Sequence, residues 1–219
     1  MKLLDLYCGA GGAAMGYYRA GFTEIIGVDI HPQKNYPFEF VQGDVLDTEF
    51  SGFDLVHASP PCQRWSGASG KNKKYWMHKD FLRPTREKLK TAGIPYVIEN
   101  VENAPLYDPL KLCGTLFPTL RVLRHRLFET SFPIEQPALN CKDHPEIYTP
   151  KKRNRGFDPY VDYVSVAGGG NCPVEAAKTA MDIDWMTYEE LSQAIPPPYT
   201  EYVGKSFILS QKHPVFANY

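Results

Sequence analysis

A chain of 219 residues, 43% hydrophobic and 22% charged, has the composition of a globular protein with one ordinary domain or one domain with a small appendage. The formal net charge of −1 argues against a uniformly basic surface, and the apolar runs are too short to span a membrane. Five scattered cysteines do not form the pattern of a disulfide framework, so we expect a cytoplasmic protein with free thiols and no signal peptide.

The positive charge is unevenly placed along the chain. Residues 71–90 contain eight Lys or Arg and two acidic residues, and "KKRNR" at 151–155 adds four more positive charges. A polyanion can bind along such patches. A solvated helix face and a loop explain them equally well, so charge alone leaves a nucleic-acid partner open.

Short apolar segments alternate with helix-like segments in the first hundred residues. Buried strands are predicted at 2–7, 24–30, 38–44, 53–59 and 95–101. Helices are predicted at 13–22 and at 79–92, where Pro84 should kink or restart the helix. This alternation predicts an α/β fold with a mostly parallel, Rossmann-like sheet.

The pattern weakens in the second half of the chain. A further strand is expected within 124–132, whereas 137–177 is rich in Pro, Asn, Gly and charge and has no clear period. A helix is predicted over 187–195, opened by a Thr-x-x-Glu capping box. A short final helix is expected from Thr200.

The first strand leads into the glycine-rich turn "CGAGG" at 8–12, which opens the predicted helix. Such corners bind anions or nucleotides, because glycine lets the backbone approach a ligand and the helix start presents free N–H groups. Asp29 ends the next strand, where it can accept from ribose hydroxyls, and Asp44 ends the third, near an adenine amino group. The spacing matches neither G-x-G-x-x-G nor a P-loop, which favours an adenosine ligand without a pyrophosphate; an ordinary packed turn is the alternative.

The stretch "ASPPCQRWS" at 58–66 presents Cys62 directly after the fourth predicted strand. Open α/β sheets place their sites at the C-terminal ends of strands, and two prolines make the approach to this cysteine rigid. A lone cysteine is more often a small buried hydrophobe, so the rest of the chain must decide its role.

In their order, these segments resemble the motifs of the cytosine-5 methyltransferases, most of which act on DNA and one branch of which acts on tRNA. "DLYCGAGGAAMGYYRAGF" is similar to the first motif, and "GVDI" and "GDV" to the next two. "SPPCQRWS" resembles the nucleophile loop, "ENV" at 99–101 the E-N-V motif and "RHR" at 124–126 the R-x-R motif. "DWMTYEELSQAIPPPY" and "YVGKSF" are similar to the closing motifs. The resemblance covers almost the whole chain except about 133–180.

The resemblance implies a DNA cytosine-5 methyltransferase that uses S-adenosylmethionine and releases S-adenosylhomocysteine. Cys62 would add to C6 of a cytosine flipped out of the duplex, because C5 alone is too weak a nucleophile. Glu99 would share a proton with N3, and Asn100 would hold the loop geometry. Arg126 is expected to donate to O2 and Arg124 to support the nucleophile loop, with surface charge beside phosphate as their alternative.

Further residues are expected to contact the cofactor or the nucleic acid. The expected cofactor contacts are Tyr7, Cys8, Gly9, Ala10, Gly11, Gly12, Asp29, Ile30, Asp44, Val45, Pro61 and Ser206. The expected nucleic-acid contacts are Gln63, Arg64, Ser66, Lys71, Lys73, Lys74, Lys151, Lys152 and Arg153. The basic loop after Cys62 is expected to close over the flipped base, unless it is a plain surface loop.

The resemblance also implies a division of the chain. Residues 1–136 and 178–219 would form the catalytic domain, and 137–177 a target-recognition region smaller than is usual in the family. Lys205 stands where the last motif usually has Asn. Cys141-x-x-His144 has half the spacing of a zinc site, but no second pair follows it, so no metal is expected.

Three alternatives remain at this point. A tRNA cytosine-5 methyltransferase shares the "SPPCQ" loop, although the Cys-Phe-Thr signature of that branch is absent. A non-catalytic nucleic-acid-binding relative would not need to keep Cys62, Glu99 and Arg126. A thiol hydrolase would need a histidine base, for which His57 and His125 are candidates. We expect a monomer that acts on DNA in a bacterial or phage setting, as in restriction-modification.

Overall fold

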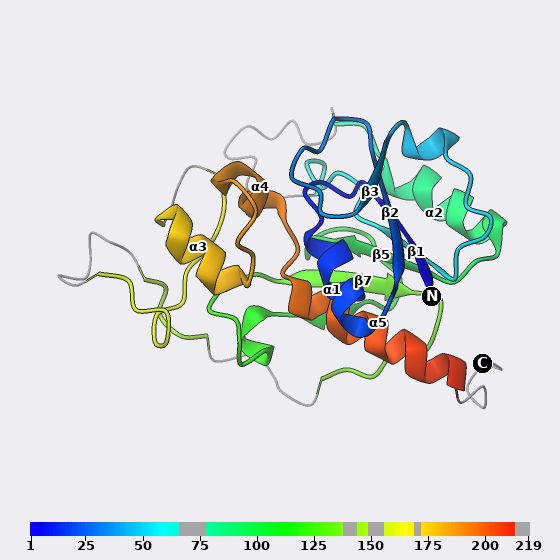
Figure 1. Ribbon diagram of the computed structural model, residues 1–219. Coiled ribbons are helices and arrows are strands. Elements are labelled where there is room, and N and C mark those ends of the chain that lie inside the picture. The colour runs from blue at the N-terminus through cyan, green and yellow to red at the C-terminus, as the bar shows by residue number, and fades with distance from the viewer. Residues whose placement is uncertain (66–77, 138–143, 149–155, 169–171, 213–219) are drawn as a thin grey trace.

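The computed structural model describes residues 1–65, 78–137, 144–148, 156–168 and 172–212 (Figure 1). Its centre is a seven-stranded sheet with the order β3-β2-β1-β4-β5-β7-β6. The strands are β1 Lys2–Leu6, β2 Glu24–Asp29, β3 Glu39–Gln42, β4 Leu55–Ala58, β5 Tyr96–Asn100, β6 Leu110–Leu112 and β7 Arg126–Thr130. The first five strands of the chain pair in parallel, and β7 runs antiparallel to both its neighbours. The prediction of an α/β fold with a mostly parallel sheet is confirmed.

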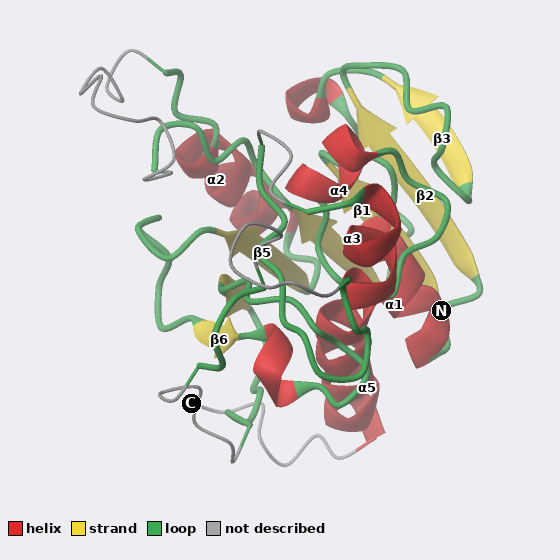
Figure 2. Cartoon of the chain, turned by 90° about the vertical axis from the view of Figure 1, so that its left-hand side faces the viewer, coloured by secondary structure: helices red, strands yellow, loops and turns green. Residues whose placement is uncertain are grey.

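Helices cover both faces of the sheet (Figure 2). They are α1 Gly12–Ala20, α2 Leu82–Ala92, α3 Val174–Met181, α4 Tyr188–Gln193 and α5 Pro197–Lys212, with short 3-10 helices at Val45–Asp47 (η1) and Gly114–Leu116 (η4). Alternate residues of a strand point to opposite faces, so Leu3 of β1 joins the core under α1 and α5, and Leu4 the core under α2. Two apolar layers thus enclose the sheet.

Glycines let α1 and α5 approach each other closely. A Cβ atom at Gly16 would lie 2.0 Å from Thr200 Oγ1 and 2.1 Å from the carbonyl oxygen of Pro197. The Thr200 hydroxyl donates to the carbonyl oxygen of Ala13 across this contact, at 2.8 Å. The C-terminal helix is therefore fixed against the helix that follows the glycine-rich turn.

Two helix starts differ from the sequence predictions. The last helix begins at Pro197 rather than Thr200 and has 16 residues, so it is not short. The basic helix begins at Leu82, which places Pro84 in its first turn instead of at a kink. The first turn of a helix has no internal partners for its N–H groups, so a proline there costs no hydrogen bond. The carboxylate of Asp80 caps this start by accepting from the N–H of Leu82 at 3.0 Å.

Within 137–177, the described segments pack on the rest of the chain. Val164 pairs with Val122 in an isolated bridge, and Tyr148 and Val166 belong to the core under α1 and α5. The helix α3 begins inside this region, and the sequence did not predict it. The division into a catalytic domain and a recognition region stays a prediction. Across the described residues, no helix has both the length and the apolar character that a membrane span needs.

Candidate active site

The ends of three neighbouring strands bring a thiol, a carboxyl and a guanidinium together. Cys62 follows β4, Glu99 lies on β5 and Arg126 begins β7. β5 pairs with β4 on one side and with β7 on the other. The charges of Glu99 and Arg126 both act on the Cys62 thiol, so the three groups form one site.

Arg126 and Glu99 form an ion pair inside this site. Arg126 Nε lies 2.9 Å from Glu99 Oε1, and the Glu99 side chain is 8% exposed. The N–H does not point at Oε1, so among the described residues this buried oxygen has no hydrogen-bond partner. Burial raises the pKa of Glu99, against the opposing effect of Arg126, Arg124 and a hydrogen bond with Ser59. A buried carboxyl with a raised pKa and an unused acceptor is suited to exchange a proton with a ligand.

Cys62 is half-buried beside this ion pair. Burial raises the pKa of its thiol, the Arg126 charge opposes this, and the Glu99 charge adds to it. The free protein thus holds a protonated thiol at neutral pH, and the charges of its neighbours set the pH at which a thiolate forms.

Asn100 fixes the loop that carries the cysteine. Its Nδ2 donates to the carbonyl oxygen of Pro60 at 2.8 Å, and its Oδ1 accepts from the N–H of Val101 at 3.0 Å. Asn100 is 1% exposed, so both bonds are shielded from water. This geometry suits the loop-holding role that the sequence predicted.

Arg124 is a buried cation that ties three segments together. Its Nη1 donates to the carbonyl oxygen of Val166 and its Nη2 to that of Ser192, both at 2.7 Å. Burial, followed by repulsion from Arg126, lowers its pKa to about 9. Arg124 thus points into the protein, which suits a supporting role, while Arg126 faces the thiol.

A chain of buried and partly buried polar groups near Glu99 was not predicted from the sequence. The Tyr17 hydroxyl lies 3.0 Å from His57 Nδ1, His57 Nε2 lies 2.9 Å from Ser59 Oγ, and Ser59 hydrogen-bonds to Glu99. Burial lowers the pKa of His57 to about 3, so its ring is neutral. A neutral ring that contacts Tyr17 and Ser59 is poorly placed as the base of a thiol hydrolase. In the sequence, the only sign of these groups is that His57 and Ser59 interrupt the apolar segment "FDLVHAS".

The glycine-rich turn has the backbone conformation that a close-fitting ligand site needs. Tyr7, Gly9 and Gly11 have φ of 55°, 48° and 82°, in the left-handed region. A Cβ atom at Gly9 would meet nothing within 4 Å, so this position opens onto free space. Asp29 braces the turn by accepting from the N–H of Gly9 at 3.1 Å. The turn is built to leave room beside its backbone.

The other predicted cofactor residues divide into an open group and a packed group. Ile30, directly after Asp29, is 58% exposed. Asp44 accepts from the N–H of Leu46 at 2.9 Å through one carboxylate oxygen. By contrast, the remaining predicted cofactor residues of the turn and of η1 are buried or partly buried. The buried members are Cys8, Ala10, Gly12 and Val45, and Pro61 is partly buried beside Cys62.

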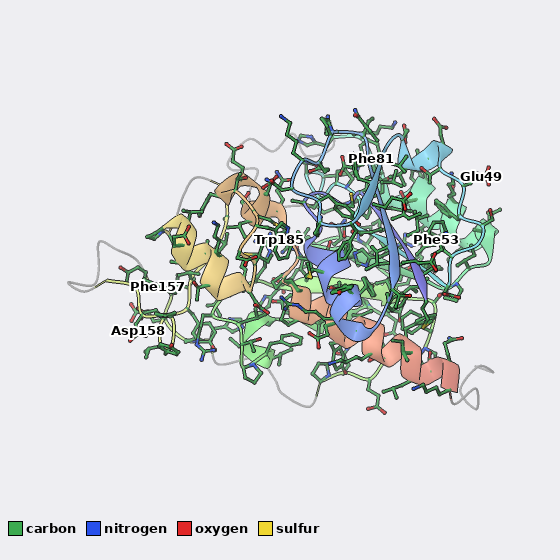
Figure 3. The ribbon with its side chains drawn as sticks, in the orientation of Figure 1. Glu49, Phe53, Phe81, Phe157, Asp158 and Trp185 are labelled. Atoms are coloured by element: carbon green, nitrogen blue, oxygen red, sulfur yellow. The ribbon has the colours of Figure 1, made fainter. Side chains whose placement is uncertain are left out.

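Trp185 contacts the glycine-rich turn, and it is not among the residues predicted from the sequence. Its Nε1 donates to the carbonyl oxygen of Ala10 at 2.8 Å, and Figure 3 shows it beside the start of α1. Ser206, by contrast, is not brought to this corner. Its hydroxyl donates to the carbonyl oxygen of Tyr202 within α5, beyond Gly204, which packs against the last residue of α1, Ala20.

The predicted nucleic-acid contacts lie mostly outside the described residues. These are Ser66, Lys71, Lys73, Lys74, Lys151, Lys152 and Arg153, and the same holds for Cys141 of the C-x-x-H spacing. Gln63 is exposed, and Arg64 donates to the carbonyl oxygen of His78 at 2.8 Å across the base of the loop. Two other cations of the 71–90 patch are structural: Arg86 pairs with the buried Glu129 at 2.7 Å, and Lys88 donates to the carbonyl oxygen of Leu46.

Known proteins match the chain in sequence and in fold. Residues 1–104, which include Cys62 and Glu99, match the family model for C-5 cytosine-specific DNA methylase. Type II methyltransferase M.FnuDI of Fusobacterium nucleatum is 36% identical over 31% of this chain, and the match spans only 22% of that protein's length. Type II methyltransferase M.AquIA of Picosynechococcus is 29% identical over 71% of this chain and 70% of its own length.

The fold match extends over nearly the whole chain. An Escherichia coli prophage-encoded protein described as a DNA modification methyltransferase has a TM-score of 0.66 and 13% identity. The comparison covers 97% of this chain and 100% of that one. The first 104 residues thus match the family model for C-5 cytosine-specific DNA methylase, and the chain as a whole shares its fold with a solved methyltransferase.

Proposed function

We propose that the protein transfers a methyl group to C5 of cytosine in DNA, with Cys62 as the nucleophile. The observation that carries this proposal is the shared site of Cys62, Glu99 and Arg126 at the C-terminal edge of the sheet. A nucleophile, a proton donor and a fixed cation are the groups that addition to a cytosine ring requires.

The Cys62 thiol and the Glu99 carboxyl carry out the addition step. The thiol proton of Cys62 passes to Glu99, a bond forms between the thiolate Sγ and C6, and the proton now held by Glu99 passes to N3 as negative charge develops there. This makes C5 electron-rich. Arg126 supplies positive charge to the O2 side, while Asn100 and Arg124 keep the loop and the strand in position.

The cycle closes by elimination. Once C5 carries the methyl group, its proton leaves to a base, the C5–C6 double bond re-forms and the Sγ–C6 bond breaks. The N3 proton then returns to Glu99. We assign no side chain to the base. Because C5 and C6 are covered inside a duplex, the cytosine must be flipped out of the stack.

The turn around Gly9 is the proposed cofactor site. S-adenosylmethionine supplies an electrophilic methyl group and leaves as S-adenosylhomocysteine. The open space beside Gly9 leaves room for a ligand, and the carboxylates of Asp29 and Asp44 are suited to accept from the ribose and the adenine of its adenosine part. A role in restriction-modification in a bacterial or phage setting, and action as a monomer, stay predictions.

Trapping with 5-fluorocytosine tests the proposal, because fluorine at C5 cannot leave as a proton and elimination is blocked. The protein is incubated with methyl-labelled S-adenosylmethionine and either duplex DNA or tRNA that contains 5-fluorocytosine. We expect a labelled covalent adduct on DNA, detected on a denaturing gel.

The control variants make this result specific. Cys62→Ala should abolish the adduct, whereas Cys172→Ser, which alters a buried thiol elsewhere, should retain it. An adduct on tRNA alone would assign the protein to the RNA branch. No adduct on either, with folded protein shown by circular dichroism, would reject a covalent methyltransferase and favour a non-catalytic binding protein.

A further inference from the structure

Three metal-binding side chains converge on the far side of the R-x-R strand from the thiol. They are Cys113, His125 and His144, whose ligand atoms all lie within 4.8 Å of one another. His125 Nε2 lies 3.2 Å from His144 Nε2, and Cys113 Sγ lies 3.5 Å from the same nitrogen. They form a cluster of one sulfur and two ring nitrogens.

The sheet dictates part of this arrangement. β6 and β7 are antiparallel, with Leu112 opposite Arg126, so the residue after Leu112, Cys113, comes beside the residue before Arg126, His125. His125 lies between the two arginines of the R-x-R motif, and its ring contacts Glu102. His144 reaches the same place from the described segment 144–148, which comes from the region predicted to recognise the target.

Outer contacts orient these groups as ligands. Glu102 Oε2 lies 2.9 Å from His125 Nδ1, and Lys111 holds the other carboxylate oxygen at 2.6 Å. A ring whose Nδ1–H donates to a carboxylate presents a lone pair at Nε2, as histidine ligands of zinc do. On the other side, the Thr115 hydroxyl donates to Cys113 Sγ at 3.3 Å.

We propose that Cys113, His125 and His144 bind a zinc ion. A tetrahedral zinc ion, with Zn–N of about 2.05 Å and Zn–S of about 2.3 Å, holds two nitrogens about 3.3 Å apart and a nitrogen and a sulfur about 3.6 Å apart. The two separations observed are 3.2 Å and 3.5 Å. The sulfur and nitrogen donors exclude Mg²⁺ and Ca²⁺, which take oxygen ligands.

The metal would have a structural role. It would fasten the segment 144–148 to the chain segment that carries Arg124 and Arg126, and so fix the target-recognition region relative to the reacting groups. The three protein ligands leave the fourth tetrahedral position to a water molecule. The sequence alone predicted no metal, because these three ligands come from separate segments with no shared spacing.

Metal content tests the proposal without any assay of methyl transfer. The full chain is purified without a histidine tag, and its zinc is measured by inductively coupled plasma mass spectrometry. We expect about one zinc per chain. Replacement by Co²⁺ should give the visible bands of a tetrahedral site and a thiolate-to-cobalt charge-transfer band in the near ultraviolet. This spectrum is recorded on the wild-type protein, so it tests the site even if the variants fold poorly.

Variants assign the ligands. Cys113→Ser and His144→Gln should each lower zinc retention at least tenfold, and Cys113→Ser should abolish the charge-transfer band. Glu102→Gln should weaken zinc binding by roughly 10- to 100-fold, since it removes only the carboxylate that orients His125. Cys172→Ser and Cys62→Ala should keep full zinc, so the result is independent of the proposed catalytic thiol. Wild-type protein without stoichiometric zinc, or full zinc in both ligand variants, would overturn the assignment.

Discussion

Among single residues, the thiol and the carboxyl of the site depend on each other's charge. Burial raises the pKa of both Cys62 and Glu99, and Arg126 opposes the effect at both. A thiolate is stabilised when Glu99 is neutral, and an ionised Glu99 holds the proton on the thiol. The pair is thus suited to carry one proton between them, which addition to cytosine then moves to N3.

Two substitutions should therefore move the titration of Cys62 in opposite directions. Glu99→Gln removes a negative charge that raises the thiol pKa, so the thiolate should form at lower pH. Arg126→Gln removes a positive charge that lowers it, so the thiolate should form at higher pH. The measurement is the rate of Cys62 alkylation by iodoacetamide against pH, followed by peptide mass spectrometry. Equal midpoints in all three proteins would show that these charges do not act on the thiol.

His57 gives the folded protein a specific sensitivity to acid. Burial lowers the pKa of His57 from 6.5 to about 3, so below pH 6.5 the unfolded chain takes up a proton that the folded chain refuses. The free energy of unfolding should then decrease as the pH is lowered below 6.5, by at most about 1.4 kcal/mol per pH unit. Relative to His57→Gln, which does not titrate, wild-type protein should lose about 2 kcal/mol between pH 6.5 and 4.5 in urea unfolding. Parallel pH profiles would contradict a neutral, buried His57.

At the scale of whole elements, α1 and α5 lie close together because Gly16 has no side chain and the contact leaves no room for one. Gly16→Ala would place a Cβ atom 2.0 Å from Thr200 Oγ1 and 2.1 Å from the carbonyl oxygen of Pro197. The helices must separate to admit it, so the free energy of unfolding should fall by about 1–3 kcal/mol or more. Gly43→Ala is the matched control, because its Cβ atom would meet nothing within 4 Å. Urea unfolding followed by circular dichroism compares the two, and an equal effect would reject the packing explanation.

The sequence predicted the parallel half of the fold well, because four of its five strands are apolar segments that the structure buries. The third, β3, was predicted as buried but is a mostly exposed strand at the edge of the sheet. The sequence placed two helix starts wrongly, since Pro84 and Pro197 were taken as breaks although proline fits a first helical turn. It missed the short strand β6, which has three residues and no period to detect. The site residues were found through motifs, whereas the Tyr17–His57–Ser59 chain required the fold, because its members lie on two elements.

Over the whole molecule, the packing of α5 decides which of its residues lie near the cofactor corner. α5 runs alongside α1 in the same direction, with Thr200 against Ala13 and Gly204 against Ala20. Ser206 lies six residues after Thr200, about 9 Å further along the helix and away from the glycine-rich turn. The motif match therefore predicted a cofactor contact at Ser206, whereas the packing of α5 places this residue away from the glycine-rich turn.

Binding of S-adenosylhomocysteine, measured by isothermal titration calorimetry, distinguishes the motif from the geometry. Ser206→Ala should leave the dissociation constant within twofold of wild type, because its hydroxyl bonds only to the helix backbone in the described structure. Asp29→Ala should weaken binding by about tenfold or more, since it removes the brace of Gly9 and the charged acceptor for a ribose, worth about 1.5–3 kcal/mol. A large loss in Ser206→Ala would instead mean that α5 shifts when the cofactor binds and carries Ser206 toward it. An unchanged Asp29→Ala would move the cofactor site away from this corner.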